Sequence, residues 1–194
     1  VEDVITNNAG IGLQTTTVDG LNYVGLSGGA AGGLTNTGGD GINASSTGAG
    51  DVVVSGFGAD GFGAEKNTDH NLGTGALSID PSTADDGMAA AILTNGGSDI
   101  HAVTKGTGNV TVSTIAGGTL DGNGTQALHG IDAEAQGTAG NVNVHVGDDI
   151  GQGVGVSSDA VLALITNAGN AGNVDVSAGG GANDATTVDI KAGN

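Results

Sequence analysis

The sequence predicts an all-β protein: a parallel β-helix, or β-solenoid, with three sides and about six coils of roughly 30 residues each. Three observations lead to this fold class. Short motifs recur in a fixed order, apolar and polar residues alternate within each motif, and Gly is abundant while large apolar side chains are scarce. Small β-branched residues and frequent Gly suit many short strands that are joined by tight turns.

The clearest repeated motif is Gly-(Asp/Asn)-Val-x-Val. Its four copies are Gly50–Val54, Gly108–Val112, Gly140–Val144 and Gly172–Val176. The last three copies begin 32 residues apart, and the first two begin 58 residues apart, which we interpret as two periods. Weaker copies lie at Gly20–Val24 and Gly75–Ile79. The second weak copy predicts a coil within the long interval.

Two further motifs repeat with a similar period. One is (Leu/Ile)-Thr-Asn, at Ile5–Asn7, Leu34–Asn36, Leu93–Asn95 and Ile165–Asn167. The other is Ile-x-Ala, at Ile42–Ala44, Ile100–Ala102 and Ile131–Ala133. Three motifs that recur in one order indicate a repeat architecture. We therefore expect the copies of each motif to be equivalent positions in successive coils.

The strand-like motifs have one constant and one variable side. In Val-x-Val and Ile-x-Ala only the middle residue changes freely; it is Val53, Thr111, Asn143 or Asp175 in the first and Asn43, His101 or Asp132 in the second. A period of two predicts half-buried strands whose constant side faces a core and whose variable side faces water. One unit cannot bury its apolar side alone, whereas units that stack in parallel bury it continuously.

The second residue of Gly-(Asp/Asn)-Val-x-Val falls at a predicted corner of the coil. It is Asp51, Asn109, Asn141 or Asn173. We expect these four side chains to form a structural ladder in which each side chain bonds to the next coil. Asp51 should fit the ladder less well than Asn, because like charges that stack closely repel.

We expect residues 1–194 to be a single β-solenoid fragment with no second domain. The repeat is weakest in the region 56–82, where the spacing of the motifs is off by several residues. We interpret this region as an irregular coil or a loop.

Composition and charge limit the function. Three Lys and no Arg face 21 Asp and Glu residues, which gives a formal net charge of −18. Such a surface repels phosphate backbones, so we expect no nucleic-acid partner. No apolar run is long enough to span a bilayer, so we expect no membrane insertion. The chain has no Cys, which excludes disulfides and thiol chemistry.

We assign no catalytic and no cofactor-binding residues. His101 and His145 occupy outward slots that other coils fill with Asn, Asp or Ser, so we interpret both as surface residues. Few aromatic residues and no Arg are present to build a sugar-binding groove. We therefore do not expect an enzyme, and we keep a polysaccharide-acting β-helix as a third hypothesis because two carboxylates across a groove would suffice for hydrolysis.

The sequence requires no cofactor and does not define a metal site. Calcium is the ion that it could best accommodate, because calcium prefers oxygen ligands and the pairs Asp85–Asp86 and Asp148–Asp149 would supply them. A regular Gly-Gly-x-Gly-x-Asp array, the sharp signal for calcium, is absent from the sequence.

A Gly-Asn-Val-x-Val strand that alternates with an Ile-x-Ala strand, in an acidic chain rich in Gly, Thr and Asn, resembles the repetitive passenger regions of bacterial autotransporters and related large surface adhesins. The resemblance is best over Leu34–Ser55 and Leu93–Ser177. It is one of repeat style and covers most of the chain. It implies a right-handed parallel β-helix that is exported and displayed outside the cell.

These observations lead to a first expectation about function, which is an extracellular structural or adhesive β-solenoid at a bacterial cell surface, as a stalk or adhesin passenger. The alternative is a self-assembling subunit of an extracellular filament, sheath or S-layer. The expected partners are flanking repeats of the same polypeptide or identical subunits, together with a host or neighbouring-cell surface.

Overall fold

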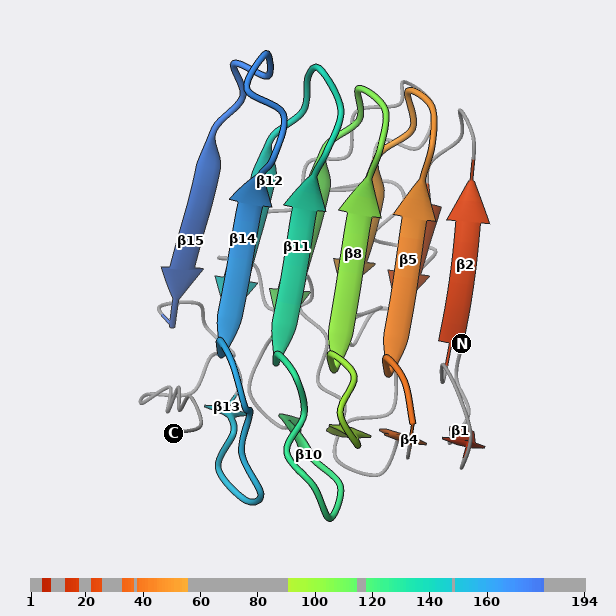
Figure 1. The fold of residues 1–194 in the computed structure, drawn as a ribbon, viewed down its shortest axis with the longest axis vertical. Helices are drawn as coiled ribbons and strands as arrows, with labels where there is room; N and C mark the ends of the chain where they lie inside the picture. Colours follow the sequence, from red (N-terminus) through yellow and green to blue (C-terminus); the bar gives the residue numbers. More distant parts are fainter. Residues whose placement is uncertain are drawn as a thin grey trace, which may run out of the picture.

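The computed structural model describes residues 5–7, 13–17, 22–25, 33–36, 38–55, 91–114, 118–147 and 149–179. These residues form only β-strands, bridges and turns, which confirms the all-β class predicted from the sequence (Figure 1). Because the described ranges contain no helix, none of them crosses a membrane as a helix.

The strands form three parallel sheets, one on each side of the coil. Sheet A contains β1 (Ile5–Asn7), β4 (Gly33–Asn36), β7 (Ala91–Thr94), β10 (Thr119–Gly122) and β13 (Asp149–Ile150). Sheet B contains β2 (Leu13–Thr17), β5 (Ile42–Ser46), β8 (Ile100–Thr104), β11 (Ile131–Ala135) and β14 (Val161–Ile165). Sheet C contains β3 (Asn22–Gly25), β6 (Val52–Ser55), β9 (Val110–Thr114), β12 (Val142–Val146) and β15 (Val174–Ala178).

The chain visits sheet A, then sheet B, then sheet C in every coil. Figure 1 shows the strands of sheet B in front and pointing up, while β15 and the rest of sheet C point down, with sheet C behind. The coils advance from β2 on the right to β14 on the left. A chain that rises in front, crosses over the top and descends behind while it moves to the left is a right-handed coil.

The structure has fewer coils than the six that the sequence predicts. Each sheet has five strands among the described residues, because β4, β5 and β6 pair directly with β7, β8 and β9. The separation of 58 residues between Asp51 and Asn109 therefore corresponds to one step along the stack and not to two. The region 56–82 and the weak motif Gly75–Ile79 lie outside the described residues.

The strand register corrects one of the three motif alignments. Ile5 pairs with Leu34 as expected, but Leu34 pairs with Ile92 and not with Leu93. Ile165 belongs to a different sheet, where it pairs with Ala135. The register follows burial and not sequence likeness, because Ile92 is fully buried and faces the core whereas Leu93 is only half-buried.

The core consists of columns of identical or similar side chains from successive coils. Sheet B contributes one Ile column and one Ala column, and sheet C contributes two Val columns. The fully buried members are Ile42, Ile100, Ile131, Ala44, Ala102, Ala133, Val52, Val110, Val142, Val54 and Val112. Full burial of one Val or Ile side chain stabilises a fold by about 1.5–3 kcal/mol. A small core of this kind is stable because each coil repeats it.

Two columns of Gly at the corner between sheets B and C bring the backbones of successive coils into contact. A Cβ atom on Gly108 would overlap the carbonyl oxygen of Gly50, and one on Gly140 would overlap that of Gly108. The second column behaves alike, since a Cβ on Gly106 would overlap the carbonyl oxygen of Gly48. These Gly residues are therefore needed for close approach of the coils.

We predict that Gly108→Ala destabilises the protein by about 2 kcal/mol or more, because the added methyl group forces the corner of one coil away from the next. Thermal unfolding followed by circular dichroism would measure the loss. Gly169→Ala is the matched control, because its Cβ would meet only the Asn167 side-chain oxygen, at 3.3 Å. Equal melting temperatures for the two variants would contradict the role of the Gly column.

Candidate functional site

The side chains of Asp51, Asn109, Asn141 and Asn173 form a hydrogen-bonded ladder at the corner next to the Gly column. The backbone N–H of Asn109 donates to Asp51 Oδ1 at 2.7 Å, and Asn109 Nδ2 donates to the same oxygen at 3.2 Å. Asn141 bonds to Asn109 Oδ1 in the same way, at 2.9 and 3.1 Å. The N–H of Asn173 donates to Asn141 Oδ1 at 2.8 Å. Each rung therefore joins one coil to the following coil.

The ladder has a direction, and this direction explains why Asp51 fits it. Asp51, Asn109 and Asn141 each accept from the following coil through Oδ1, and every rung after the first also donates to the coil before it. The first rung only has to accept, which a carboxylate does well. Repulsion between stacked carboxylates, the reason for expecting Asp51 to fit less well than Asn, does not arise here, because its neighbour in the ladder is the uncharged Asn109.

A second polar cluster lies on the outward side of sheet B and joins three coils. Asn43 Nδ2 donates to Asp40 Oδ2 at 2.8 Å and lies 3.1 Å from His101 Nδ1. His101 Nδ1 also lies 3.3 Å from Asp40 Oδ2, and its Nε2 lies 3.9 Å from Asp132 Oδ2. His101 was expected to be a surface residue, but it is a half-buried bridge between two carboxylates.

The charges in this cluster shift one another's protonation. The hydrogen bond to Asp40 raises the pKa of His101; burial opposes this effect, and the nearby carboxylates of Asp132 and Glu134 add to it. Burial alone would raise the pKa of Asp40, but hydrogen bonds from His101, Asn43 and the Ser98 N–H hold it below its usual value. Burial raises the pKa of Asp132. The cluster therefore favours a protonated His101 beside an ionised Asp40.

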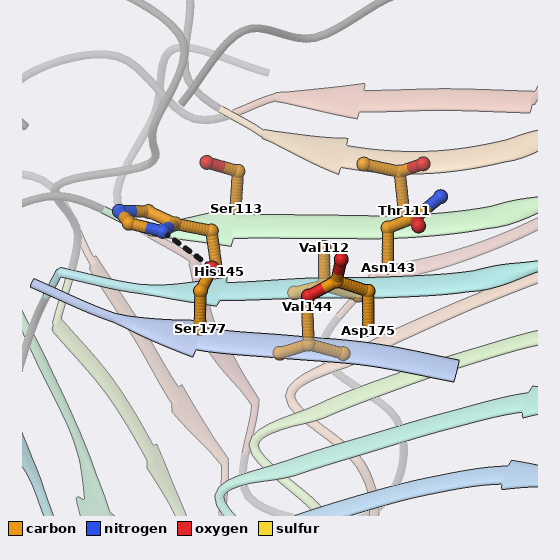
Figure 2. A pocket seen from close by; sticks show the side chains of 8 residues that line it. All are labelled: Thr111, Val112, Ser113, Asn143, Val144, His145, Asp175 and Ser177. Atoms are coloured by element: carbon orange, nitrogen blue, oxygen red, sulfur yellow. Dashed lines mark hydrogen bonds between the residues drawn. The ribbon is translucent and has the colours of Figure 1, made fainter. Parts of the chain in front are cut away.

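The outward side of sheet C carries a shallow cavity of about 210 Å³. Figure 2 shows two rows of side chains in it, one from each outward position of β9, β12 and β15. The rows are Thr111, Asn143 and Asp175, and Ser113, His145 and Ser177. On sheet C, the expectation that the outward side faces water is wrong at three described positions, because Val53, Ser113 and His145 are buried. Two of these, Ser113 and His145, line the cavity.

One contact in the cavity has the geometry of a nucleophile and a base. His145 Nδ1 and Ser177 Oγ are 3.0 Å apart, which Figure 2 marks with a dashed line. A Ser hydroxyl that contacts a His ring is a common arrangement in nucleophilic catalysis. Here the two residues are paired across adjacent strands in the ordinary parallel register. The contact follows from stacking of outward positions, and we assign no reaction to it.

Asp99 is a buried acid at the corner between sheets A and B. Thr94 Oγ1 lies 2.8 Å from the Gly97 carbonyl oxygen and 2.9 Å from Asp99 Oδ1. One hydroxyl hydrogen serves only one of these acceptors. A protonated Asp99 resolves the conflict, because it donates to Thr94 while Thr94 donates to Gly97. Burial raises the pKa of Asp99 well above its usual value, which agrees with this assignment.

The repeat itself accommodates Asp99. The equivalent residues in other coils are Gly41, Gly130 and Ala160, each of which precedes the first residue of a sheet B strand. A Cβ on Gly41 would overlap Cγ2 of Ile92 in the following coil, and Gly130 faces Ile150 in the same way. The coil after Asp99 has Leu120 at this position, which lacks the γ2 methyl group. A misfit residue in an otherwise regular column could have revealed this site from the sequence.

Asp121 binds the backbone of the following coil and was also missed by the sequence analysis. Its Oδ1 accepts from the N–H of Gly155 at 2.5 Å, and its Oδ2 accepts from the N–H groups of Gly153 and Val154. The Gly122 N–H donates to Oδ1 as well, at 2.8 Å. A carboxylate that accepts several backbone N–H groups fixes a turn strongly. Asp121 therefore holds the turn that follows β13.

Among the described residues, no group of three or more His, Asp or Glu side chains is placed to hold a metal ion. Of the acidic pairs considered for calcium, Asp85, Asp86 and Asp148 lie outside the described residues. Asp149 is half-buried at the start of β13. His129 Nδ1 lies 3.7 Å from Asp159 Oδ2 and accepts a hydrogen bond from the Asp159 N–H at 3.3 Å.

Comparisons with protein-family models, with curated proteins and with solved structures found no match for this chain.

We predict that Asn109→Asp destabilises the protein by about 1–3 kcal/mol at neutral pH, because it removes a donor to Asp51 and places two carboxylates together. Chemical denaturation would measure the loss, which should shrink when the pH falls below about 4 and the carboxylates become protonated. Asp51→Asn keeps the acceptor oxygen and is the matched control, with an expected change within about 0.5 kcal/mol. Similar losses in both variants would argue against a directional ladder.

We predict that Asp99→Asn stabilises the protein at pH 8 by at least about 1 kcal/mol. The pKa of Asp99 is raised in the folded state, so its stabilising contribution is complete below its unfolded pKa and is lost as pH rises through the folded pKa. Asn cannot titrate and donates to Thr94 at every pH, so the advantage of the variant should vanish near pH 3. Melting temperatures across this pH range would test it.

Asp175→Asn is the control for that experiment, because Asp175 is exposed on β15. A stability profile of Asp99→Asn that runs parallel to that of the wild type at all pH values would contradict a neutral Asp99.

Proposed function

We propose that this chain is a rigid, non-catalytic rod of a protein that is displayed on the outside of a bacterial cell, as a stalk or adhesive passenger. The main support for the proposal is that polar side chains of the kind that could bind a ligand instead form hydrogen bonds between successive coils. The ladder begun by Asp51, the cluster around His101 and the carboxylate of Asp121 each connect one coil to the next. Such a stack resists bending and unravelling.

The charge of the chain supports an exposed, self-supporting rod. A formal net charge of −18 keeps a repetitive β-rich protein soluble and opposes lateral association of neighbouring rods. The same charge disfavours a nucleic-acid partner. Adhesion to a host or neighbouring cell would use the variable outward positions, such as Asn143 and Asp175 on sheet C.

A second candidate function is a self-assembling subunit of an extracellular filament, sheath or S-layer. The observation that favours it is the exposure of Val174 (45%) and Val176 (50%), whose equivalents in the preceding coil are buried. Unpaired strand edges at the end of a solenoid allow stacking of subunits.

Sedimentation velocity across a range of concentrations, with calcium and then with chelator, separates the two functions. A single elongated monomer in both conditions is the result expected for a stalk. Large assemblies that dissolve in chelator would instead favour a calcium-linked sheath or S-layer subunit. Antibodies against the chain should label intact source cells, and labelling only after permeabilisation would exclude display at the surface.

A further inference from the structure

The end of the described stack is formed by the last strand of each sheet, β13, β14 and β15. Each of these strands has a neighbour on one side only among the described residues. We define the C-terminal stacking surface as Gly172, Asn173, Val174 and Val176. These residues repeat, one coil later, the positions that form the tightest contacts inside the stack.

The two Val residues of this surface continue buried columns into solvent. Val142 is fully buried and Val144 is 2% exposed, whereas Val174 and Val176, which pair with them, are 45% and 50% exposed. β15 covers Val142 and Val144 of β12 with two apolar side chains in register. A following strand with two apolar side chains in the same register would cover Val174 and Val176 in the same way. An apolar pair left open in this way favours the addition of another strand.

The amide ladder is also open at this surface. The N–H of Asn173 donates to Asn141, but no described residue donates to Asn173 Oδ1. In each inner coil this oxygen accepts from the Asn of the following coil. The N–H of each first Val in turn donates to the carbonyl of that same Asn, as Val142 does to Asn173 at 2.9 Å. A following Asn would donate its N–H to the Asn173 side-chain oxygen, and its backbone carbonyl would accept from the N–H of Val174.

The position beside the ladder accepts only Gly. A Cβ on Gly172 would overlap the carbonyl oxygen of Gly140, as a Cβ on Gly140 would overlap that of Gly108. By the same geometry, a residue placed over Gly172 must lack a Cβ. The surface thus specifies Gly, Asn, Val and a second Val, in that order and spacing.

We propose that the C-terminal stacking surface binds a parallel β-coil whose strand reads Gly-Asn-Val-x-Val, the sequence type of β9, β12 and β15 and of the residues before them. The inference rests on the proposed rod function and names the partner that extends the rod. The coil-to-coil contact repeated inside the stack is the model for this interface, so backbone bonding supplies affinity and the Gly and Asn positions supply selectivity.

A second copy of this chain, stacked head to tail, fits the surface poorly. Its first coil would present β3, in which Asn22 occupies the position of Val52. The residue before Asn22 in the sequence is Leu21 and not Asn. The first coil of a second copy therefore does not read Gly-Asn-Val-x-Val. The surface therefore selects a matching repeat over the chain's own first coil.

The test uses the full 194-residue chain and a fluorescent peptide with the sequence of residues 137–147, capped at both ends. Fluorescence anisotropy should show saturable binding. Peptides that carry Gly140→Ala or Asn141→Leu should bind about tenfold more weakly or worse. On the protein, Val176→Asp should abolish binding, whereas Leu164→Asp, which changes an exposed apolar residue on sheet B, should not. Circular dichroism verifies that both variants fold.

Three results would overturn the inference. One is no saturable binding to the wild-type chain, and another is binding that survives Val176→Asp. The third is self-association of the wild-type chain in sedimentation velocity that Val176→Asp abolishes, because a second copy would then be the occupant. Small-angle scattering on the same sample separates this inference from the proposed function. An elongated monomer that binds no peptide would contradict only the binding of a further coil. A compact particle would contradict the proposed rod function.

Discussion

The close contact between the backbones of successive coils is the constraint on which the rest of the structure depends. Parallel strands lie about 4.8 Å apart, so any residue on the stacking face meets its own equivalent in the next coil. At the corner between sheets B and C the backbones come so close that Gly108 and Gly140 have no room for a side chain. Once these corners are fixed, the columns of Ile, Ala and Val follow, because small and similar side chains stack without gaps.

The close stacking of the coils also restricts where acidic side chains can lie. A carboxylate that meets a second carboxylate in the next coil would be costly, and the described acids avoid this in different ways. Asp51 faces an amide, Asp121 faces backbone N–H groups, and Asp99, whose pKa is raised by burial, contacts the hydroxyl of Thr94. Only Asp40 shares a cation, the ring of His101, with Asp132. The strongly negative chain therefore places few unscreened charges within the stack.

Much of the fold could be predicted from the sequence, because a solenoid repeats its signals. Val-x-Val and Ile-x-Ala identified strands, their buried sides and their parallel pairing, since only one side of each strand stays constant. The number of coils could not be predicted, because an interval of 58 residues between Asp51 and Asn109 reads equally well as two coils or as one coil with an insertion. The direct pairing of β5 with β8 shows that it is one coil with an insertion, and this pairing is seen only in the structure.

The sites were less predictable than the fold. The positions that form the amide ladder could be recognised because they repeat, whereas Asp99 and Asp121 occur once and carry no motif. The alternating pattern places His145 on the outward side of sheet C, which it predicts to be exposed. His145 is nevertheless buried, and the pattern contains no signal for this burial. Repetition reveals what the coils share. A residue that breaks a column, as Asp99 does between Gly41 and Gly130, marks its own position, but its contacts require the coordinates.

The uninterrupted pairing of β6 with β9 across residues 56–90 has a consequence for how such a chain can change in evolution. The connection between β6 and β7 has 35 residues and that between β9 and β10 has four, yet β6 and β9 still pair in register. The entropic penalty for closing a longer loop grows only slowly with its length. The corner between sheets C and A is therefore permissive for insertions and deletions. The opposite corner, crowded by Gly108 and its equivalents, is not. A repeat built this way can acquire new surface segments at one edge while its stacking rule stays unchanged at another.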